Sequence, residues 1–426
     1  MMSQETDGEP VFEDEFMADE ILVVRLPARC AARCTVLSKP FRQLLATPHF
    51  WLRHQSLGAP LELPHAACMQ RHNNGRNDFY FQFHVVGPTF IIEHTVSMEN
   101  GVFYTSTCNG LVLVSGPSCP YDNVVFNPAT KEEVRLSLQL PQPGKEDVDR
   151  HIIGLGYGPS SKVYKALILE TGDTSTRLLV VSLDGSGDQE PRTVFSSDED
   201  MDCAHCLHTT DGKVYFFIYP INWSDYSNVL CVLAFDVDNE AMTKIAIPEG
   251  HDISTRMMLL VHGRPCVYTE KGQDTILWVL TTDHQWEQLC ILVKESSPPR
   301  GDLVGAWECG GGLLFVEFDY RAAYMYNLHE ADGDEKKGSS GSRLVAVSSM
   351  KIKYKRSKYD CPHNLWGYQP SLITPASIFG DAAFSTGCRE SVGPKQEVDR
   401  TFLEMTQKSV VDPMMHMLSL LCSTSG

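Results

Sequence analysis

The sequence predicts an α+β multidomain protein in which a small helical module is followed by a large all-β domain. Apolar residues recur with helical spacing between Glu20 and Phe50, and short runs rich in Val, Ile, Leu, Phe and Tyr begin at Phe79. Turn residues separate these runs and recur at intervals of about fifty residues. We expect a disordered acidic leader over 1–15, a helical module over 16–55, a linker over 56–78, the β-domain over 79–378, and a partly helical or disordered tail over 379–426.

Composition limits the class of protein. Of the 426 residues, 42% are hydrophobic and 21% are charged, as in a globular chain. The net charge of −18 opposes general binding to nucleic acid. No apolar run approaches the length of about eighteen residues that a membrane-spanning helix needs, and the acidic N-terminus lacks the apolar core of a signal peptide. We expect no nucleic-acid or membrane partner, a cytoplasmic and/or nuclear location, and reduced thiols for the 14 irregularly spaced cysteines.

The helical module is predicted to contain three short helical segments. Pro27 ends the first, Ala28–Leu37 forms the second, and Pro40 begins the third, which Pro48 ends. A module of about thirty residues cannot bury its own apolar side chains, so we expect a docking surface. The alternative is a mini-bundle packed on its own chain; a DNA-reading helix-turn-helix conflicts with the helix break and the acidic charge. The residues expected on the docking surface are Ile21, Leu22, Leu26, Pro27, Leu37, Phe41, Leu44 and Leu45.

This module resembles the F-box in its flowering-plant form. The matching residues are Glu20-Ile21-Leu22, Arg25-Leu26-Pro27-Ala28, Arg33-Cys34, Leu37-Ser38-Lys39, Phe41-Arg42, Leu44-Leu45 and Pro48-His49-Phe50. The F-box binds a Skp-type adaptor and, through it, a cullin-RING ubiquitin ligase, so the resemblance implies these partners. The Leu-Pro pair that usually opens the motif is absent. A degenerate F-box scaffold without ligase binding is therefore the alternative.

The β-domain is predicted to contain about twenty strands. Its period is that of the four-stranded blades of a kelch-like β-propeller, with five clear units and a sixth that includes Phe79–Glu93. A pair of large β-sandwiches is the alternative fold. The turns expected to begin units are Asn109-Gly110, Gly154–Gly156, Asp211-Gly212, His262-Gly263 and Gly310–Gly312.

The same region resembles the F-box-associated domain that follows the F-box in a large plant family. The four signatures are Thr107-Cys108-Asn109-Gly110-Leu111-Val112, Phe126-Asn127-Pro128-Ala129-Thr130-Lys131-Glu132, Gly154-Leu155-Gly156-Tyr157-Gly158 with Tyr164-Lys165, and Tyr368-Gln369-Pro370-Ser371-Leu372-Ile373. In that family the domain captures the protein to be ubiquitinated. The resemblance implies a non-catalytic substrate-recognition subunit that binds an unidentified target protein.

Two motifs have ligand-like spacing. Cys203-Ala204-His205-Cys206-Leu207-His208 could supply zinc ligands, but it continues into a predicted strand, so we expect core or edge-strand residues. Gly154–Lys162 looks like a phosphate cradle, yet it precedes a strand instead of a helix, and we expect a turn at the start of a blade. We predict no catalytic residue, cofactor or metal. A propeller enzyme or lectin remains the competing function.

Overall fold

The computed structural model describes the chain in part. Two compact units are present, Met1–Phe384 and Ser385–Gly426, and every described residue belongs to the first. The predicted tail helix lies outside the described residues. These residues are 31, 39–45, 47, 50–51, 53–54, 65–71, 79–86, 90–98, 103–115, 123–130, 132–136, 138, 148–172, 175–183, 190–199, 201–220, 231–248, 258–271, 274–293, 302–309, 312–319, 322–330, 344–353, 362–368, 373 and 375.

β-strands dominate the described part of the chain, as the sequence predicts for the β-domain. Helix α3 (Lys39–Leu45) precedes them. Strands of the first half are β1 (His65–Arg71), β2 (Phe79–Val86), β3 (Phe90–Met98), β4 (Phe103–Cys108), β5 (Leu111–Ser115), β6 (Asn123–Asn127), β7 (Glu132–Leu136), β8 (Asp149–Gly158), β9 (Val163–Thr171), β10 (Thr176–Ser182), β11 (Arg192–Ser197) and β12 (Met201–His208). Strands of the second half are β13 (Lys213–Pro220), β14 (Cys231–Asp236), β15 (Ala241–Ile245), β16 (Leu259–Val261), β17 (Arg264–Lys271), β18 (Asp274–Leu280), β19 (Trp286–Val293), β20 (Asp302–Cys309), β21 (Gly312–Asp319), β22 (Ala322–Glu330), β23 (Leu344–Lys353) and β24 (Pro362–Tyr368).

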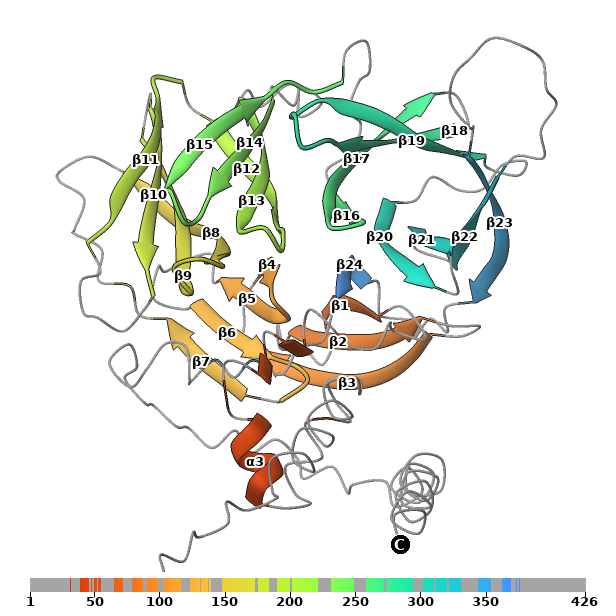
Figure 1. Cartoon of the computed structure of the whole chain (residues 1–426), viewed down its shortest axis with the longest axis horizontal. Helices are drawn as coiled ribbons and strands as arrows, with labels where there is room; N and C mark the ends of the chain where they lie inside the picture. Colours follow the sequence, from red (N-terminus) through yellow and green to blue (C-terminus); the bar gives the residue numbers. More distant parts are fainter. Residues whose placement is uncertain are drawn as a thin grey trace, which may run out of the picture. The chain divides into compact units, whose positions relative to one another are not determined.

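The described strands form six antiparallel groups of four. Two groups are separate sheets, in the orders β24-β1-β2-β3 and β11-β10-β9-β8. The others are joined in pairs into two eight-stranded sheets, through short parallel pairings of β4 with β12 and of β19 with β23. Figure 1 shows the groups following one another around a common centre. This is the arrangement of a six-bladed β-propeller, with β24 and β1–β3 as blade 1, β4–β7 as blade 2, β8–β11 as blade 3, β12–β15 as blade 4, β16–β19 as blade 5 and β20–β23 as blade 6.

Blade 1 is completed by β24, the last of the described strands. β24 pairs with β1, with Ala66 opposite Gly367, and β1 pairs with β2 on its other side. β1 lies inside the segment 56–78 that we predicted as a linker, so the β-domain begins earlier than expected, at His65. The sequence HAACMQR lacks the β-branched and aromatic residues that mark the other strands, and pairing on both sides stabilises it instead.

The blades pack against each other through strands that are buried on both faces. β5 and β9 are buried along almost their whole lengths. One core cluster between blades 3 and 4 includes Leu167, Phe216 and Phe235. Another joins blades 4 and 5 through Phe217 and Val267. This burial explains why the strands read as continuous apolar runs without a polar alternation.

Candidate functional site

Three of the predicted adaptor-binding residues, Phe41, Leu44 and Leu45, lie in α3. Pro40 occupies the first turn, where a missing N–H is tolerated. Leu44 and Leu45 are only 9% and 5% exposed, in a cluster that also contains Phe50 and Trp51. The two leucines therefore pack within the chain itself.

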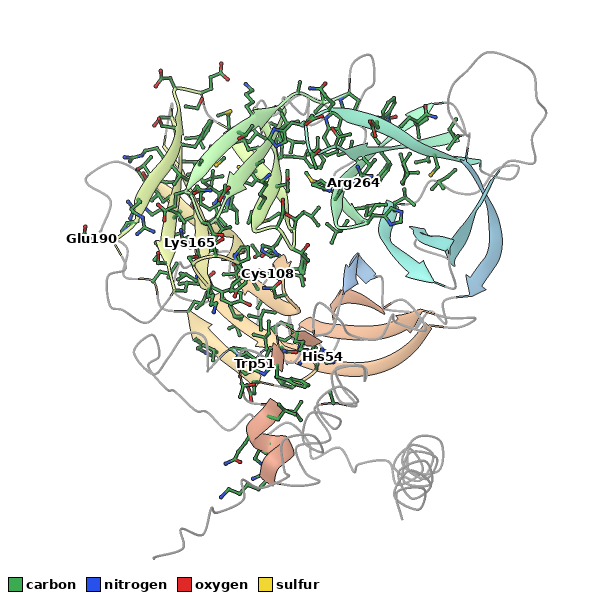
Figure 2. The ribbon with its side chains drawn as sticks, in the orientation of Figure 1. Trp51, His54, Cys108, Lys165, Glu190 and Arg264 are labelled. Carbon is green, nitrogen blue, oxygen red and sulfur yellow. The ribbon has the colours of Figure 1, made fainter. Side chains whose placement is uncertain are left out.

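The end of α3 is fixed by hydrogen bonds. Thr47 donates its N–H and its hydroxyl to the Leu44 carbonyl, at 3.0 and 2.8 Å. The Trp51 indole donates to the Leu45 carbonyl at 2.5 Å. Figure 2 labels Trp51 and His54, whose side chains are both buried. The side chain of Phe41 and the residues Ile21, Leu22, Leu26, Pro27 and Leu37 lie outside the described residues, so adaptor binding stays a prediction.

The first β-domain signature forms a tight turn between β4 and β5. Asn109 and Gly110 have φ values of 52° and 76°, which match a two-residue hairpin turn that only such residues adopt at low cost. The Asn109 side-chain amide donates to the Tyr164 hydroxyl of blade 3 at 3.1 Å. Tyr164 in turn contacts Tyr157, with ring centroids 4.7 Å apart. The first and third signatures therefore meet where blades 2 and 3 touch.

Burial determines the chemistry of this contact. Tyr164 is 4% exposed, and burial raises the pKa of its hydroxyl well above the usual value. Burial likewise raises the pKa of Tyr157. Both phenols remain protonated at neutral pH and serve as hydrogen-bonding and packing groups.

The second and fourth signatures also meet. The Asn127 side-chain oxygen accepts hydrogen bonds from the N–H groups of Ala129 and Thr130, at 2.8 and 3.4 Å, and so shapes the turn after β6. Its amide nitrogen donates to the Ile373 carbonyl at 2.5 Å. Asn127 is fully buried, and one side chain thus joins blade 2 to the chain that follows β24.

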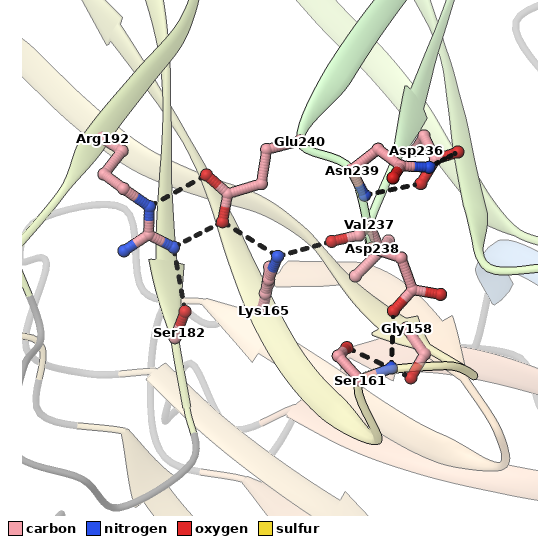
Figure 3. Close-up of polar contacts among 10 residues, drawn as sticks. All are labelled: Gly158, Ser161, Lys165, Ser182, Arg192, Asp236, Val237, Asp238, Asn239 and Glu240. Atoms are coloured by element: carbon pink, nitrogen blue, oxygen red, sulfur yellow. Dashed lines mark hydrogen bonds and ion pairs between the residues drawn. The ribbon is translucent and has the colours of Figure 1, made fainter.

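A charged network joins blade 3 to the turn between β14 and β15 (Figure 3). Lys165 Nζ donates to the Val237 carbonyl at 2.5 Å and lies 2.9 Å from Glu240 Oε1. Arg192 holds the same carboxylate through Nε at 2.9 Å and Nη2 at 2.6 Å, and Nη2 also donates to Ser182 at 2.9 Å. The hydrogen bonds from Arg192 lower the pKa of Glu240 to about 2 against the effect of burial. We call Lys165, Arg192 and Glu240 the interblade clamp.

Asp238 adds a second contact between the same blades. Its carboxylate accepts hydrogen bonds from the N–H groups of Ser160 and Ser161, at 3.0 and 2.8 Å. Burial raises its pKa, but the hydrogen bonds from Ser161 and Ser160 outweigh burial and lower the pKa to about 2. Asp238, Arg192 and Glu240 were not predicted as site residues. The polar run Asp236–Glu240, which follows an apolar strand, was the sequence feature that could have indicated these contacts.

The glycine-rich motif allows close packing between blades. Gly154, Gly156 and Gly158 lie in strand β8, and the turn consists of the following residues 159–162, so the prediction of a glycine turn was wrong. A Cβ added at Gly154 would lie 2.1 Å from Cys206 Sγ, and one at Gly156 would lie 2.6 Å from a Val237 methyl group. The glycines are required because blade 4 leaves no room for side chains.

The Cys203–His208 motif forms β12, which confirms the expected strand residues. Burial raises the pKa of both the Cys203 and the Cys206 thiols. Burial lowers the pKa of His208 to about 4, although its ring donates to the Tyr157 carbonyl at 3.3 Å. Within the described ranges, no group of three or more His, Cys, Asp or Glu side chains is placed to hold a metal ion. In the same ranges, no helix is long and apolar enough to cross a membrane.

Comparison with known proteins identifies the family to which the β-domain is similar. Residues 67–305 match the F-box associated beta propeller domain. The chain is 24% identical over 325 residues to an Arabidopsis thaliana protein whose name describes it as an F-box protein, covering 71% of this chain and 78% of that protein. It is 29% identical over 150 residues to the F-box protein CPR1 of the same plant, covering 34% of this chain and 35% of CPR1.

Solved structures provide a more distant comparison. The periplasmic gluconolactonase of Pseudomonas aeruginosa is 11% identical, covering 70% of this chain and 84% of that chain, with a TM-score of 0.39. An oligogalacturonate lyase in complex with manganese is 14% identical, covering 61% of this chain and 76% of that chain, with a TM-score of 0.36. Similarity at this level carries no argument about activity.

Proposed function

Because the chain belongs to the F-box associated β-propeller family, we propose that it is a substrate-recognition subunit of a Skp–cullin–F-box ubiquitin ligase. The match over residues 67–305, downstream of a segment that resembles the F-box, is the observation that carries the proposal. The relatives named as F-box proteins support it. The N-terminal segment would bind the Skp-type adaptor, and the β-domain would bind the target protein.

The proposed mechanism is proximity. A subunit that holds a target beside the charged ubiquitin-conjugating enzyme raises the effective concentration of the target's lysines. Rigid positioning favours this role, and the interblade clamp and the buried tyrosine contact both fix neighbouring blades relative to each other. Such a subunit needs no catalytic residue of its own.

Burial of Leu44 and Leu45 refines which residues would contact the adaptor. Leu44 and Leu45, which are 9% and 5% exposed, would anchor α3 to the rest of the chain instead of contacting the adaptor. Leu26 and Phe41 are then the better candidates for direct contact, since docking surfaces depend on a few central apolar anchors.

A pull-down with a purified Skp-type adaptor tests the proposal. We expect the wild-type chain to bind the adaptor, and we expect Leu26→Asp combined with Phe41→Ala to abolish binding. Thr243→Ala, at an exposed position of β15, is the matched control and should bind as the wild type does. Circular dichroism of each variant would verify that the β-domain remains folded.

Two results would contradict the proposal. Unchanged binding by the double variant would mean that this segment does not contact the adaptor. A folded wild-type chain that binds no adaptor would instead favour the degenerate F-box scaffold.

A further inference from the structure

An exposed serine lies at the end of the outer strand of blade 3. β11 is the edge strand of its sheet, so it has a paired neighbour on one side only. Ser196 is the last but one residue of this strand, and its side chain is exposed. An extended segment at a sheet edge is open to a second protein that binds extended peptides.

The residues that follow this serine are acidic. Asp198 and Glu199 are both exposed, and Asp200 comes next in the sequence. Glu199 stands three residues after Ser196. A kinase with a basic substrate groove would recognise this charge pattern, since charge complementarity determines which partner is accepted.

The neighbouring Ser197 is less suited to modification. Its hydroxyl oxygen accepts a hydrogen bond from the Glu199 N–H at 3.1 Å, and its side chain is half-buried. In the pairing of β10 with β11 it lies opposite Thr176, which is 1% exposed. The structure therefore favours Ser196 over Ser197.

An arginine lies opposite Ser196 on the same face of the sheet. Arg177 of β10 pairs in register with Ser196, and its side chain is 50% exposed. Residues directly opposite each other in an antiparallel pair have Cβ atoms about 5 Å apart. A phosphate on Ser196 would thus be within reach of the Arg177 guanidinium, which forms strong paired hydrogen bonds with phosphate.

Arg177 can bind a phosphate without leaving a buried charge unpaired. It forms an ion pair with Glu170, whose side chain is 3% exposed. Arg150 holds the same carboxylate, with Nε 2.5 Å from Oε2. If Arg177 moved to a phosphate, Arg150 would still neutralise Glu170, so the usual cost of a solitary buried charge would not arise.

We propose that Ser196 is a phosphorylation site for an acidophilic serine kinase and that Arg177 binds the phosphate. The kinase transfers the γ-phosphoryl group of ATP to Ser196 Oγ. The bond between the γ-phosphorus and the bridging oxygen breaks, ADP leaves, and the hydroxyl proton is released. The proposal is independent of adaptor binding, because it rests only on blade 3 and on the residues after β11.

Phosphorylation of the full-length protein tests the choice of residue. The purified chain is incubated with ATP and a casein-kinase-type acidophilic serine kinase, and the modified residue is located by mass spectrometry. We expect phosphate on Ser196, complete loss of that phosphate in Ser196→Ala, and retention of it in Ser197→Ala. Glu199→Gln should slow the reaction at least several-fold. Phosphate on Ser197 alone, or on neither serine, would overturn the proposal.

A phosphorus NMR titration tests the role of Arg177. The second pKa of a phosphoserine is about 6, and a nearby guanidinium stabilises the dianion. We expect this pKa to be lower by about half a unit or more in the wild type than in Arg177→Gln. Because Arg150 still holds Glu170, Arg177→Gln should fold, and its melting temperature would be measured alongside. Equal phosphate pKa values in two folded proteins would overturn the assignment of Arg177.

Discussion

At the scale of single residues, the family signatures act as contacts between parts of the chain that are distant in sequence. Asn109 shapes a turn and bonds Tyr164, and Asn127 shapes a turn and bonds Ile373. In both cases one side-chain amide both sets the local backbone and joins two segments. A substitution at such a position removes both the stabilisation of the turn and the hydrogen bond to the distant segment, and the two contributions can be measured separately.

Asn109 allows that separation. Asn109→Gly keeps a residue that tolerates the left-handed backbone and removes the hydrogen bond, so we expect a loss of about 1 kcal/mol in the free energy of unfolding. Asn109→Ala also forces a Cβ into that backbone conformation and should lose about 1–2 kcal/mol more. Urea denaturation of both variants measures the difference. Equal stability of the two variants would refute the backbone contribution.

Gly154 tests the packing between blades 3 and 4. Gly154→Ala places a Cβ 2.1 Å from Cys206 Sγ, and we expect a loss of about 1–3 kcal/mol in the free energy of unfolding. Cys206→Ala in the same chain should restore part of this loss, because the sulfur is removed while the Cys206 Cβ remains. Thermal unfolding of the single and double variants provides the measurement, and no recovery in the double variant would argue against this contact.

At the scale of elements, the turn between β14 and β15 connects blade 4 to blade 3 through side-chain contacts. Glu240 interacts with Lys165 and Arg192, while Asp238 accepts two backbone N–H groups from the turn between β8 and β9. The Glu240 contacts are partly buried, so salt screens them less than it screens pairs in open solvent. The turn therefore contributes to blade orientation more than its short length suggests.

The clamp predicts a specific dependence of stability on pH. The pKa of Glu240 falls from 4.5 to about 2 on folding, so its contribution is fully present above pH 5 and is lost as the pH falls toward 2. We expect Glu240→Gln to reduce stability at pH 7, and the difference from wild type to shrink at pH 3. Glu287→Gln, at an exposed position of β19, is the control. A difference that does not change between pH 7 and pH 3 would contradict this role of the carboxylate.

At the scale of the whole molecule, β24 closes the ring by pairing with β1. Truncation tests how much stability depends on this closure. A chain that ends at Phe384 lacks the second compact unit and should unfold at nearly the wild-type temperature. A chain that ends at Cys361 lacks β24, exposes the edge of β1, and should aggregate or lose its cooperative transition. Size-exclusion chromatography and thermal unfolding would distinguish these outcomes, and a stable, monomeric shorter chain would disprove the importance of closure.

The sequence predicted the β-domain well because most strands are apolar runs between turn residues, as in β5 and β13. It missed β1, whose residues acquire their conformation from pairing with β2 and β24. It also missed the interblade clamp, since nothing local indicates that Glu240 will meet Lys165 and Arg192. Contacts of this kind depend on how the blades pack against one another. The spacing of residues along one segment does not predict that packing.

Closure by β24 also has a consequence for the time course of synthesis. β1 leaves the ribosome well before its partner β24, the last of the described strands. At about 5–20 residues per second, β1 waits roughly 15–60 s for that partner. During this interval the unpaired edge of β1 is accessible to chaperones or to a second nascent chain. The N-terminal segment emerges earlier still, so an adaptor could meet this protein before its ring has closed.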